Sequence, residues 1–215
     1  RYISVTGVQT CALPIYEVCL VPSFSKVISR KDCDTSAKFG LRFFNLPIVP
    51  ANMKSVITVE MAEFLASNNY FYIMHRFDID IIDFIQHMWM RNLFISISVG
   101  VNKDSYDLLD EIDKRGLTLD YITVDIAHGH SEKMLHMLRY LNKKFKKTFI
   151  IAGNVCTPEG VYFLTHNGAN AVKVGIGPGL ACTTRFKTGF WRPQFSAVLE
   201  CTQSATVPII ADGGI

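Results

Sequence analysis

The segment YITVDIAHGHSEKMLHMLRYLNKKFKKTFIIAGN, residues 121–154, decides the fold prediction. Its two ends, 121–127 and 148–154, are short and rich in Ile, Val and Phe, as strands buried on both faces are. Between them, 131–145 has apolar residues at helical spacing, begins at a serine and carries its basic residues late, where the helix dipole favours them. The segment therefore predicts one strand–helix–strand unit of a parallel sheet.

The same alternation continues on both sides of this unit. Further strands are predicted at 46–51, 70–75, 94–100, 171–176 and 208–214, and further helices at 58–69, 78–92, 103–116 and 157–168. Seven strands at this spacing favour a (β/α)8 TIM barrel over an open sheet, although a complete barrel needs about eight strands. We therefore predict an α/β protein with a (β/α)8 barrel that is incomplete at its C-terminus.

The first residues differ from the rest. Residues 1–15 have no pattern that continues into the barrel, and they look like translated sequencing-adapter sequence, so we predict a non-native segment at 1–15 and a partial barrel catalytic domain at 16–215. An unclosed barrel exposes two strand edges and part of its core. We therefore expect this polypeptide by itself to be unstable and inactive.

Composition excludes several classes of function. The chain has 22 basic and 19 acidic residues, and its densest basic run, 143–147, is interrupted by Phe145, which is typical of a solvated helix end and not of a nucleic-acid site. No apolar run reaches the roughly 18–20 residues that a membrane span needs, and we expect no signal peptide, because residues 1–15 have no continuous apolar stretch. The six cysteines form no CxxC pair or metal-ligand spacing. These features predict a reduced, cytoplasmic protein that binds neither nucleic acid nor membrane.

Polar residues follow the predicted strands, at the end of a barrel where function collects. They are His75 and Arg76, the run Asp125–Ser131, Gly153 with Asn154, the loop at 175–185, and Asp212 with the two glycines after it. One such residue by itself is explained as a helix cap. Five polar strand ends on one rim predict a functional site.

GIGPGLACTTR, residues 175–185, follows the strand predicted at 171–176. Its glycines permit backbone angles that other residues avoid, so the loop can turn carbonyls toward a cation or amides toward a phosphate. The loop presents Cys182, whose thiolate would be a nucleophile. For Cys19, Cys33, Cys156 and Cys201 a small buried cysteine is the better interpretation. The residues alone predict a barrel enzyme with a cysteine nucleophile on a loop.

This loop, VGIGPGLACTTR, resembles the catalytic loop of the inosine-monophosphate dehydrogenase and guanosine-monophosphate reductase family. Four further motifs resemble that family in the same order: VPANM at 49–53, VDIAHGHS at 124–131, IAGNV at 151–155 and IIADGGI at 209–215. The reductase branch is favoured because no room for paired CBS modules separates the strands at 70–75 and 94–100, and because CTTRFKTGF and PQFSAV resemble the reductase version. Two alternatives stay open: a dehydrogenase that lacks its CBS insertion, and a catalytically inactive nucleotide-binding fragment.

The resemblance implies the activity and its partners. A reductase of this family converts GMP to IMP and ammonia with NADPH, through a thioimidate on the cysteine, and assembles as a homotetramer. Cys182 matches the nucleophile and Thr184 the threonine that assists proton transfer, whose glutamate partner would lie beyond Ile215. The cofactor contacts match Ser29, Arg30, Arg76, Asp125, Ile126, Ala127, Ile176 and Gly177. The substrate contacts match Met53, Asn154, Asp212, Gly213 and Gly214. A monovalent cation, K⁺, is implied at Gly177, Gly179, Cys182 and Arg185.

Three residues depart from the family pattern. Lys54 follows the ANM motif where many relatives have Asp, which puts local cofactor contacts in question. His128 and His130 replace an Asn and a Tyr that other reductases have. A His-x-His pair without a third ligand is a weak signal for a metal site.

Overall fold

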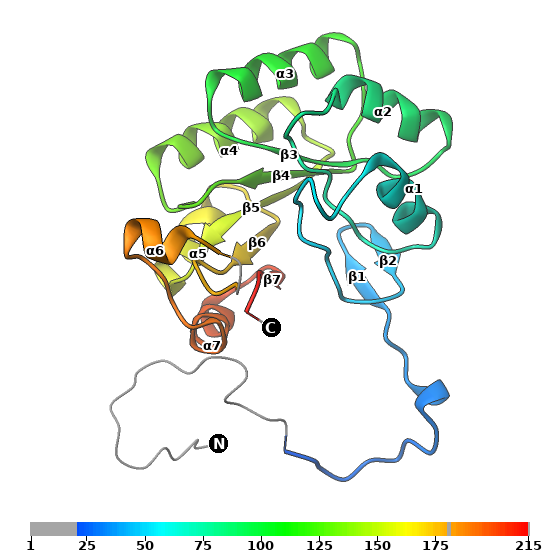
Figure 1. The fold of residues 1–215 in the computed structure, drawn as a ribbon, viewed down its shortest axis with the longest axis vertical. Helices are drawn as coiled ribbons and strands as arrows, with labels where there is room; N and C mark the ends of the chain where they lie inside the picture. Colours follow the sequence, from blue (N-terminus) through cyan, green and yellow to red (C-terminus); the bar gives the residue numbers. More distant parts are fainter. Residues whose placement is uncertain (1–20, 180–181, 215) are drawn as a thin grey trace.

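The computed structural model describes residues 21–179 and 182–214, and its centre is a curved parallel sheet (Figure 1). The strands are β3 (Ser96–Val99), β4 (Tyr121–Asp125), β5 (Phe149–Val155), β6 (Ala171–Val174) and β7 (Ile209–Ala211), and they lie side by side in chain order. All four pairings between them are parallel. The predicted α/β class with a parallel sheet is confirmed.

The two earliest predicted strands differ in the structure. The segment at 70–75 contributes a single parallel bridge, Met74 to Ile97, which continues the sheet beyond β3. The segment at 46–51 forms no strand, so that prediction is wrong. It contains Pro47 and Pro50, and each proline lacks the N–H that a sheet ladder requires.

The five helices predicted after strands all form. They are α1 (Val59–Ser67), α2 (Ile81–Met90), α3 (Lys103–Lys114), α4 (Glu132–Lys144) and α5 (Pro158–His166). The side chains of Thr58, Asp80 and Thr157 accept hydrogen bonds from the first-turn amides of α1, α2 and α5, which satisfies donors that a helix leaves unpaired. Two further helices, α6 (Thr184–Thr188) and α7 (Gln194–Ser204), were not predicted. The second of these, α7, packs against β6, β7 and α5.

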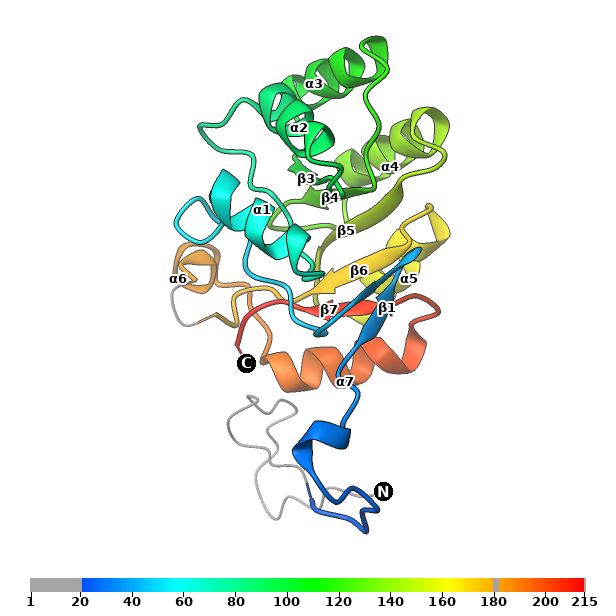
Figure 2. The same ribbon diagram turned by 90° about the vertical axis from the view of Figure 1, so that its right-hand side faces the viewer.

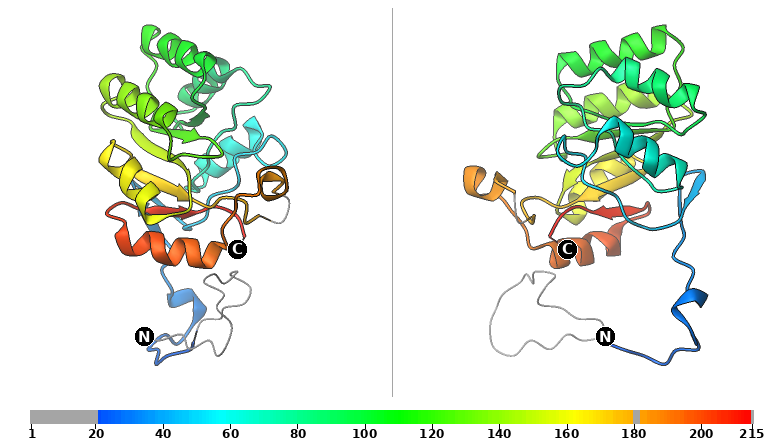
Figure 3. Two further views of the ribbon diagram at one scale, coloured as in Figure 1. Left: turned by 90° about the vertical axis from the view of Figure 1, so that its left-hand side faces the viewer. Right: turned by 45° about the vertical axis from the view of Figure 1, so that its right-hand side comes forward.

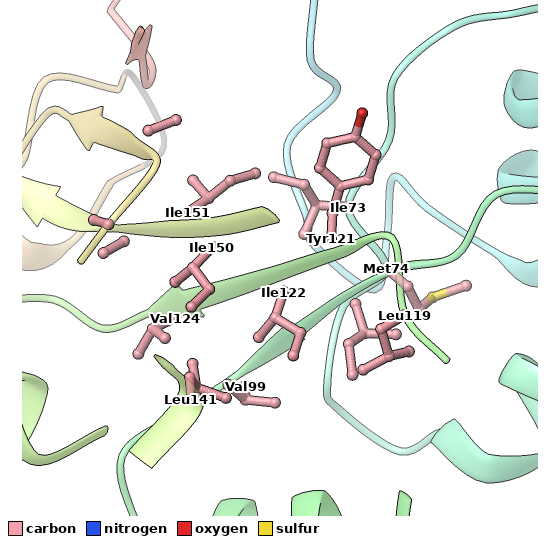
Figure 4. Packing of buried hydrophobic residues seen from close by; sticks show 14 of the residues in the cluster. Ile73, Met74, Val99, Leu119, Tyr121, Ile122, Val124, Leu141, Ile150 and Ile151 are labelled. Carbon is pink, nitrogen blue, oxygen red and sulfur yellow. The ribbon is translucent and has the colours of Figure 1, made fainter. Parts of the chain in front are cut away.

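The helices cover the outer face of the curved sheet (Figure 2). Figure 4 shows Ile122 and Val124 of β4 on the same side of the sheet as Leu141 of α4, whereas Tyr121 lies on the opposite side with Ile73. All five side chains are at most 2% exposed. Because side chains alternate along a strand, Tyr121, Thr123 and Asp125 share the inner face of the barrel. This alternation brings Asp125 to the inner rim.

A hairpin that was not predicted covers the amino ends of the strands. Its strands are β1 (Ala37–Phe39) and β2 (Arg42–Phe44), which pair antiparallel. Their aromatic rings pack among those at the starts of β4 and β5, with ring centroids 4.9–6.3 Å apart: Phe39, Phe44, Phe71, Phe94, Tyr121 and Phe149. The Tyr121 hydroxyl also donates to the carbonyl of Phe39 at 2.7 Å. The hairpin therefore closes the bottom of the sheet with an aromatic cluster.

The segment before the hairpin is exposed and carries the short 3₁₀ helix η2 (Arg30–Asp32), which lies away from the sheet (Figure 3). The predicted non-native segment at 1–15 lies outside the described residues, and its assignment stays a prediction. Within residues 21–179 and 182–214, no helix combines the length and the apolar character needed to cross a membrane.

Candidate active site

A cavity of about 560 Å³ opens at the carboxyl ends of the strands, within the usual size range of small-molecule sites. It is bounded by the ends of β4, β5 and β7, by the loop after β6, and by the segment before α1. Its lining residues are Ala51, Met53, Arg76, Asp125, Ile126, Ala127, Asn154, Gly175, Ile176, Gly177, Pro178, Gly179, Cys182, Thr184, Asp212, Gly213 and Gly214. Most of the predicted rim residues therefore share one cavity, whereas His75 and residues 128–131 do not line it.

Both predicted catalytic residues line this cavity. Cys182 is a free, half-buried thiol, and its amide donates to the carbonyl of Gly179 at 3.0 Å. Thr184 begins α6 two residues later. Of the cysteines that the structure describes, Cys182 alone reaches the cavity; Cys11 and Cys19 lie outside the described residues.

The structural interpretation of two other thiols agrees with their surroundings. Burial raises the pKa of the Cys156 thiol, and it raises that of Cys201 to about 11, so both remain protonated at neutral pH. A protonated, enclosed thiol is a poor nucleophile. Cys33 is exposed, contrary to the expectation of a buried side chain.

Six of the eight residues predicted to contact a cofactor lie together in the cavity: Arg76, Asp125, Ile126, Ala127, Ile176 and Gly177. The Arg76 guanidinium lies 3.5 Å from the carbonyl of Asp125 and stacks on the Phe77 ring. Ser29 and Arg30 do not line the cavity. Ser29 instead caps η2 on the exposed segment before the hairpin.

All five residues predicted to contact a substrate line the cavity. Asn154 donates from Nδ2 to the carbonyl of Gly175 at 2.7 Å and to Oδ2 of Asp212 at 2.5 Å. Asp212 follows β7, and its amide donates to the carbonyl of Val174 at 2.9 Å. These bonds hold the Asp212 carboxylate beside the loop that carries Cys182.

Two glycines allow the loops after β6 and β7 to approach each other. A Cβ on Gly175 would lie 2.3 Å from the carbonyl oxygen of Asp212, and one on Gly214 would lie 2.8 Å from Cβ of Pro178. Both glycines also have positive φ, +151° and +72°, which side chains disfavour. Glycine is therefore required at both positions for the site to assemble.

The predicted cation residues lie at the same loop. Gly177, Gly179 and Cys182 line the cavity, and Arg185 lies beside it, because a Cβ on Gly177 would be 3.4 Å from the Arg185 Cβ. Within the described residues, no group of three or more His, Cys, Asp or Glu side chains is arranged to hold a metal ion. The rings of His128 and His130 are 6.4 Å apart.

Sequence reasoning missed a buried charge directly beneath the cavity. Lys173, in β6, has a side chain that is only 4% exposed. Its ammonium group lies 3.3 Å from Oδ2 of Asp212, 3.6 Å from Oδ1 of Asp125 and 3.1 Å from Oδ1 of Asn52. The sequence does contain a sign of this buried charge, because Lys173 interrupts an apolar run that is typical of a buried strand.

The fold and the cavity together are typical of α/β-barrel enzymes, whose active sites lie at the carboxyl ends of the strands. Residues 12–215 match the family model described as the IMP dehydrogenase / GMP reductase domain. The chain belongs to this family, as the five motifs predicted.

Curated relatives agree with this assignment. The chain is 51% identical over 202 residues to a GMP reductase of Albidiferax ferrireducens, and 52% identical over 204 residues to one of Staphylococcus carnosus. These alignments cover 92% and 93% of this chain, but the chain spans only 62% of the length of either relative.

A solved structure agrees with the fold. The crystal structure of inosine 5′-monophosphate dehydrogenase from Legionella pneumophila superimposes with a TM-score of 0.84 at 34% identity, covering 95% of this chain and 62% of that one. The predicted partial barrel is confirmed.

Proposed function

We propose that the protein is an NADPH-dependent GMP reductase, which converts GMP to IMP and ammonia. The observation that carries the proposal is that Cys182 lines one cavity with Asp125 and with the Asp212–Gly214 loop. That combination provides a nucleophile, a carboxylate for ribose hydroxyls and glycine amides for a phosphate. The relatives named above, at 51% and 52% identity, carry the name GMP reductase.

In the proposed reaction, the Cys182 thiolate attacks C2 of the purine, and the bond from C2 to the exocyclic nitrogen breaks. Thr184 assists proton delivery to the departing ammonia. NADPH supplies the hydride that reduces C2, after which the carbon–sulfur bond breaks and the thiolate is restored. Overall, GMP, NADPH and two protons give IMP, NADP⁺ and ammonium. Dividing the displacement into two steps lowers the barrier to each.

The cavity residues divide between the two ligands. Asp212, Gly213 and Gly214 would hold the ribose and phosphate of GMP, while Met53 and Asn154 would line the purine pocket. Arg76 is suited to the extra phosphate that distinguishes NADPH from NADH, because guanidinium pairs strongly with phosphate. Asp125 and the two residues after it, together with Ile176 and Gly177, would contact the rest of the cofactor. Ser29 and Arg30 remain predicted cofactor contacts outside this cavity.

Two features of the resemblance complete the proposal. We propose a K⁺ ion at the carbonyls of Gly177, Gly179 and Cys182, near Arg185, because hard carbonyl oxygens are the donors that this loop offers. We also propose assembly as a homotetramer, which light scattering would measure.

The test uses protein expressed from the complete gene, so that any residues beyond Ile215 are present. NADPH absorbance is followed after GMP is added, with Cys182→Ala and Cys33→Ala as matched variants. We expect consumption in the wild type and in Cys33→Ala, whose thiol is exposed and lies outside the cavity, and none in Cys182→Ala. Consumption that survives in Cys182→Ala would refute the nucleophile.

An IMP dehydrogenase without its CBS insertion is the second candidate, favoured by the similarity to the Legionella structure. It would leave NADPH untouched with GMP, and would produce NADH from IMP and NAD⁺. A protein that binds GMP but turns over neither pair would instead be a non-catalytic nucleotide-binding relative.

A further inference from the structure

Lys173 is a fully buried lysine with three polar partners. It lies in β6 between Val172 and Val174, both of which are 0% exposed. An ammonium group is costly to bury unless carboxylates and hydrogen bonds compensate it. Here two carboxylates and one amide oxygen lie within 3.6 Å of its Nζ.

The register of the sheet explains how one side chain reaches both carboxylates. Asp125, Gly153 and Lys173 are aligned partners on β4, β5 and β6. A Cβ on Gly153 would lie 2.5 Å from the Cβ of Lys173, so any side chain there would obstruct the lysine. The absence of a side chain on β5 lets Lys173 cross that strand to Asp125, while Asp212 lies just beyond β7 on its other side.

Amide groups fix the two carboxylates further. Asn52 donates to Oδ2 of Asp125 at 2.7 Å while its own Oδ1 contacts Lys173. Asn154 donates to Oδ2 of Asp212, the same oxygen that Lys173 approaches. One cation thus stands between two oriented carboxylates that both line the cavity.

We propose that Lys173 is a positioning residue that holds the Asp125 and Asp212 carboxylates in place, and so links the cofactor and nucleotide parts of the site. The inference rests on the proposed function, which assigns Asp125 to the cofactor and Asp212 to GMP. Two neighbouring carboxylates repel each other unless a cation stands between them. A structural role alone would be met at lower cost by an apolar residue such as the valines beside it.

The experiment measures two dissociation constants in the full-length protein: GMP by calorimetry and NADPH by fluorescence. Lys173→Met should weaken both by about tenfold or more, because each carboxylate loses a charge-assisted contact. Lys173→Arg keeps the charge and should recover most of the affinity. Lys103→Met, at an exposed lysine on α3, is the control and should change neither constant.

A double-mutant cycle separates positioning from general damage to the fold. In an Asp212→Asn background, Lys173→Met should cost much less GMP affinity than in the wild type, because the carboxylate that it orients is gone. An equal loss in both backgrounds would indicate a purely structural role and overturn the inference.

A milder variant covers the case in which Lys173→Met does not fold. Asn52 is only partly buried, and Asn52→Ala removes its contacts with Lys173 and Asp125. NADPH affinity should fall several-fold while GMP affinity stays within about twofold. Unchanged NADPH affinity would contradict the network.

Failure of this inference is distinguishable from failure of the proposed function. If the wild type binds no GMP, the proposed function fails and the role of Lys173 fails with it. If the wild type binds GMP and Asp212→Asn weakens it, but Lys173→Met does not, only the positioning role is wrong.

Discussion

Gly175→Ala should damage both the stability of the protein and its nucleotide site. The new Cβ would lie 2.3 Å from the carbonyl oxygen of Asp212, a separation that real Cβ atoms do not show. It would also stand 3.2 Å from Nε2 of Gln194, whose side chain is 1% exposed and cannot easily move. The loop after β7 must therefore shift, and Asp212 shifts with it.

The free-energy cost has two parts. An alanine held in a sparsely populated positive-φ region costs about 1–3 kcal/mol from backbone strain. Overpacking of an enclosed site adds about 1–3 kcal/mol. Gly116→Ala is the matched control, because Gly116 has φ +66° with no heavy atom within 4 Å of the added Cβ. The Gly116→Ala variant should lose only the free energy that comes from backbone strain.

Thermal unfolding of the two variants isolates the contact. At about 2–4 °C per kcal/mol for a chain of this size, Gly175→Ala should melt roughly 2–12 °C below Gly116→Ala. GMP affinity should fall by about tenfold or more in Gly175→Ala and stay at the wild-type value in Gly116→Ala. The reasoning is refuted if the two variants melt together, or if Gly175→Ala binds GMP as well as the wild type.

Two further predictions concern the hairpin and a buried histidine. Phe44→Ala should lower the free energy of unfolding, measured with a chemical denaturant, by about 3–5 kcal/mol, because Phe44 is 3% exposed. Phe43→Ala, at a neighbour that is 65% exposed, should change it by no more than about 0.5 kcal/mol. Equal losses in the two variants would contradict the aromatic cluster. Burial, with Lys54 nearby, lowers the pKa of His75 below its usual 6.5, so the unfolded chain takes up a proton first and stability falls as pH drops through about 6.5. His75→Gln should reduce that fall in urea unfolding between about pH 7.5 and pH 5.5, and an unchanged fall would show that His75 does not cause it.

The sequence predicted the repeating part of the fold because burial on both faces leaves a strong pattern. Strands β3 to β7 and helices α1 to α5 each lie within a predicted range, except that β5 extends one residue further, to Val155. The hairpin was missed because its strands are three residues long and its aromatic side chains resemble any apolar run. The segment at 46–51 was overpredicted because its apolar residues outweighed its two prolines, although those prolines remove the donors that a sheet needs.

Site residues that directly follow a strand were predictable from the sequence, because the barrel topology brings all such residues to one rim. This is why Asp125, Asn154, Cys182 and Asp212 line one cavity. Lys173 required more than topology. A lysine within an apolar strand signals a buried charge, but its partners follow only from the register that aligns it with Gly153 and Asp125. Register is a property of paired strands, and a single strand's sequence does not contain it. The residue proposed here to link both halves of the site was therefore the one that needed the structure.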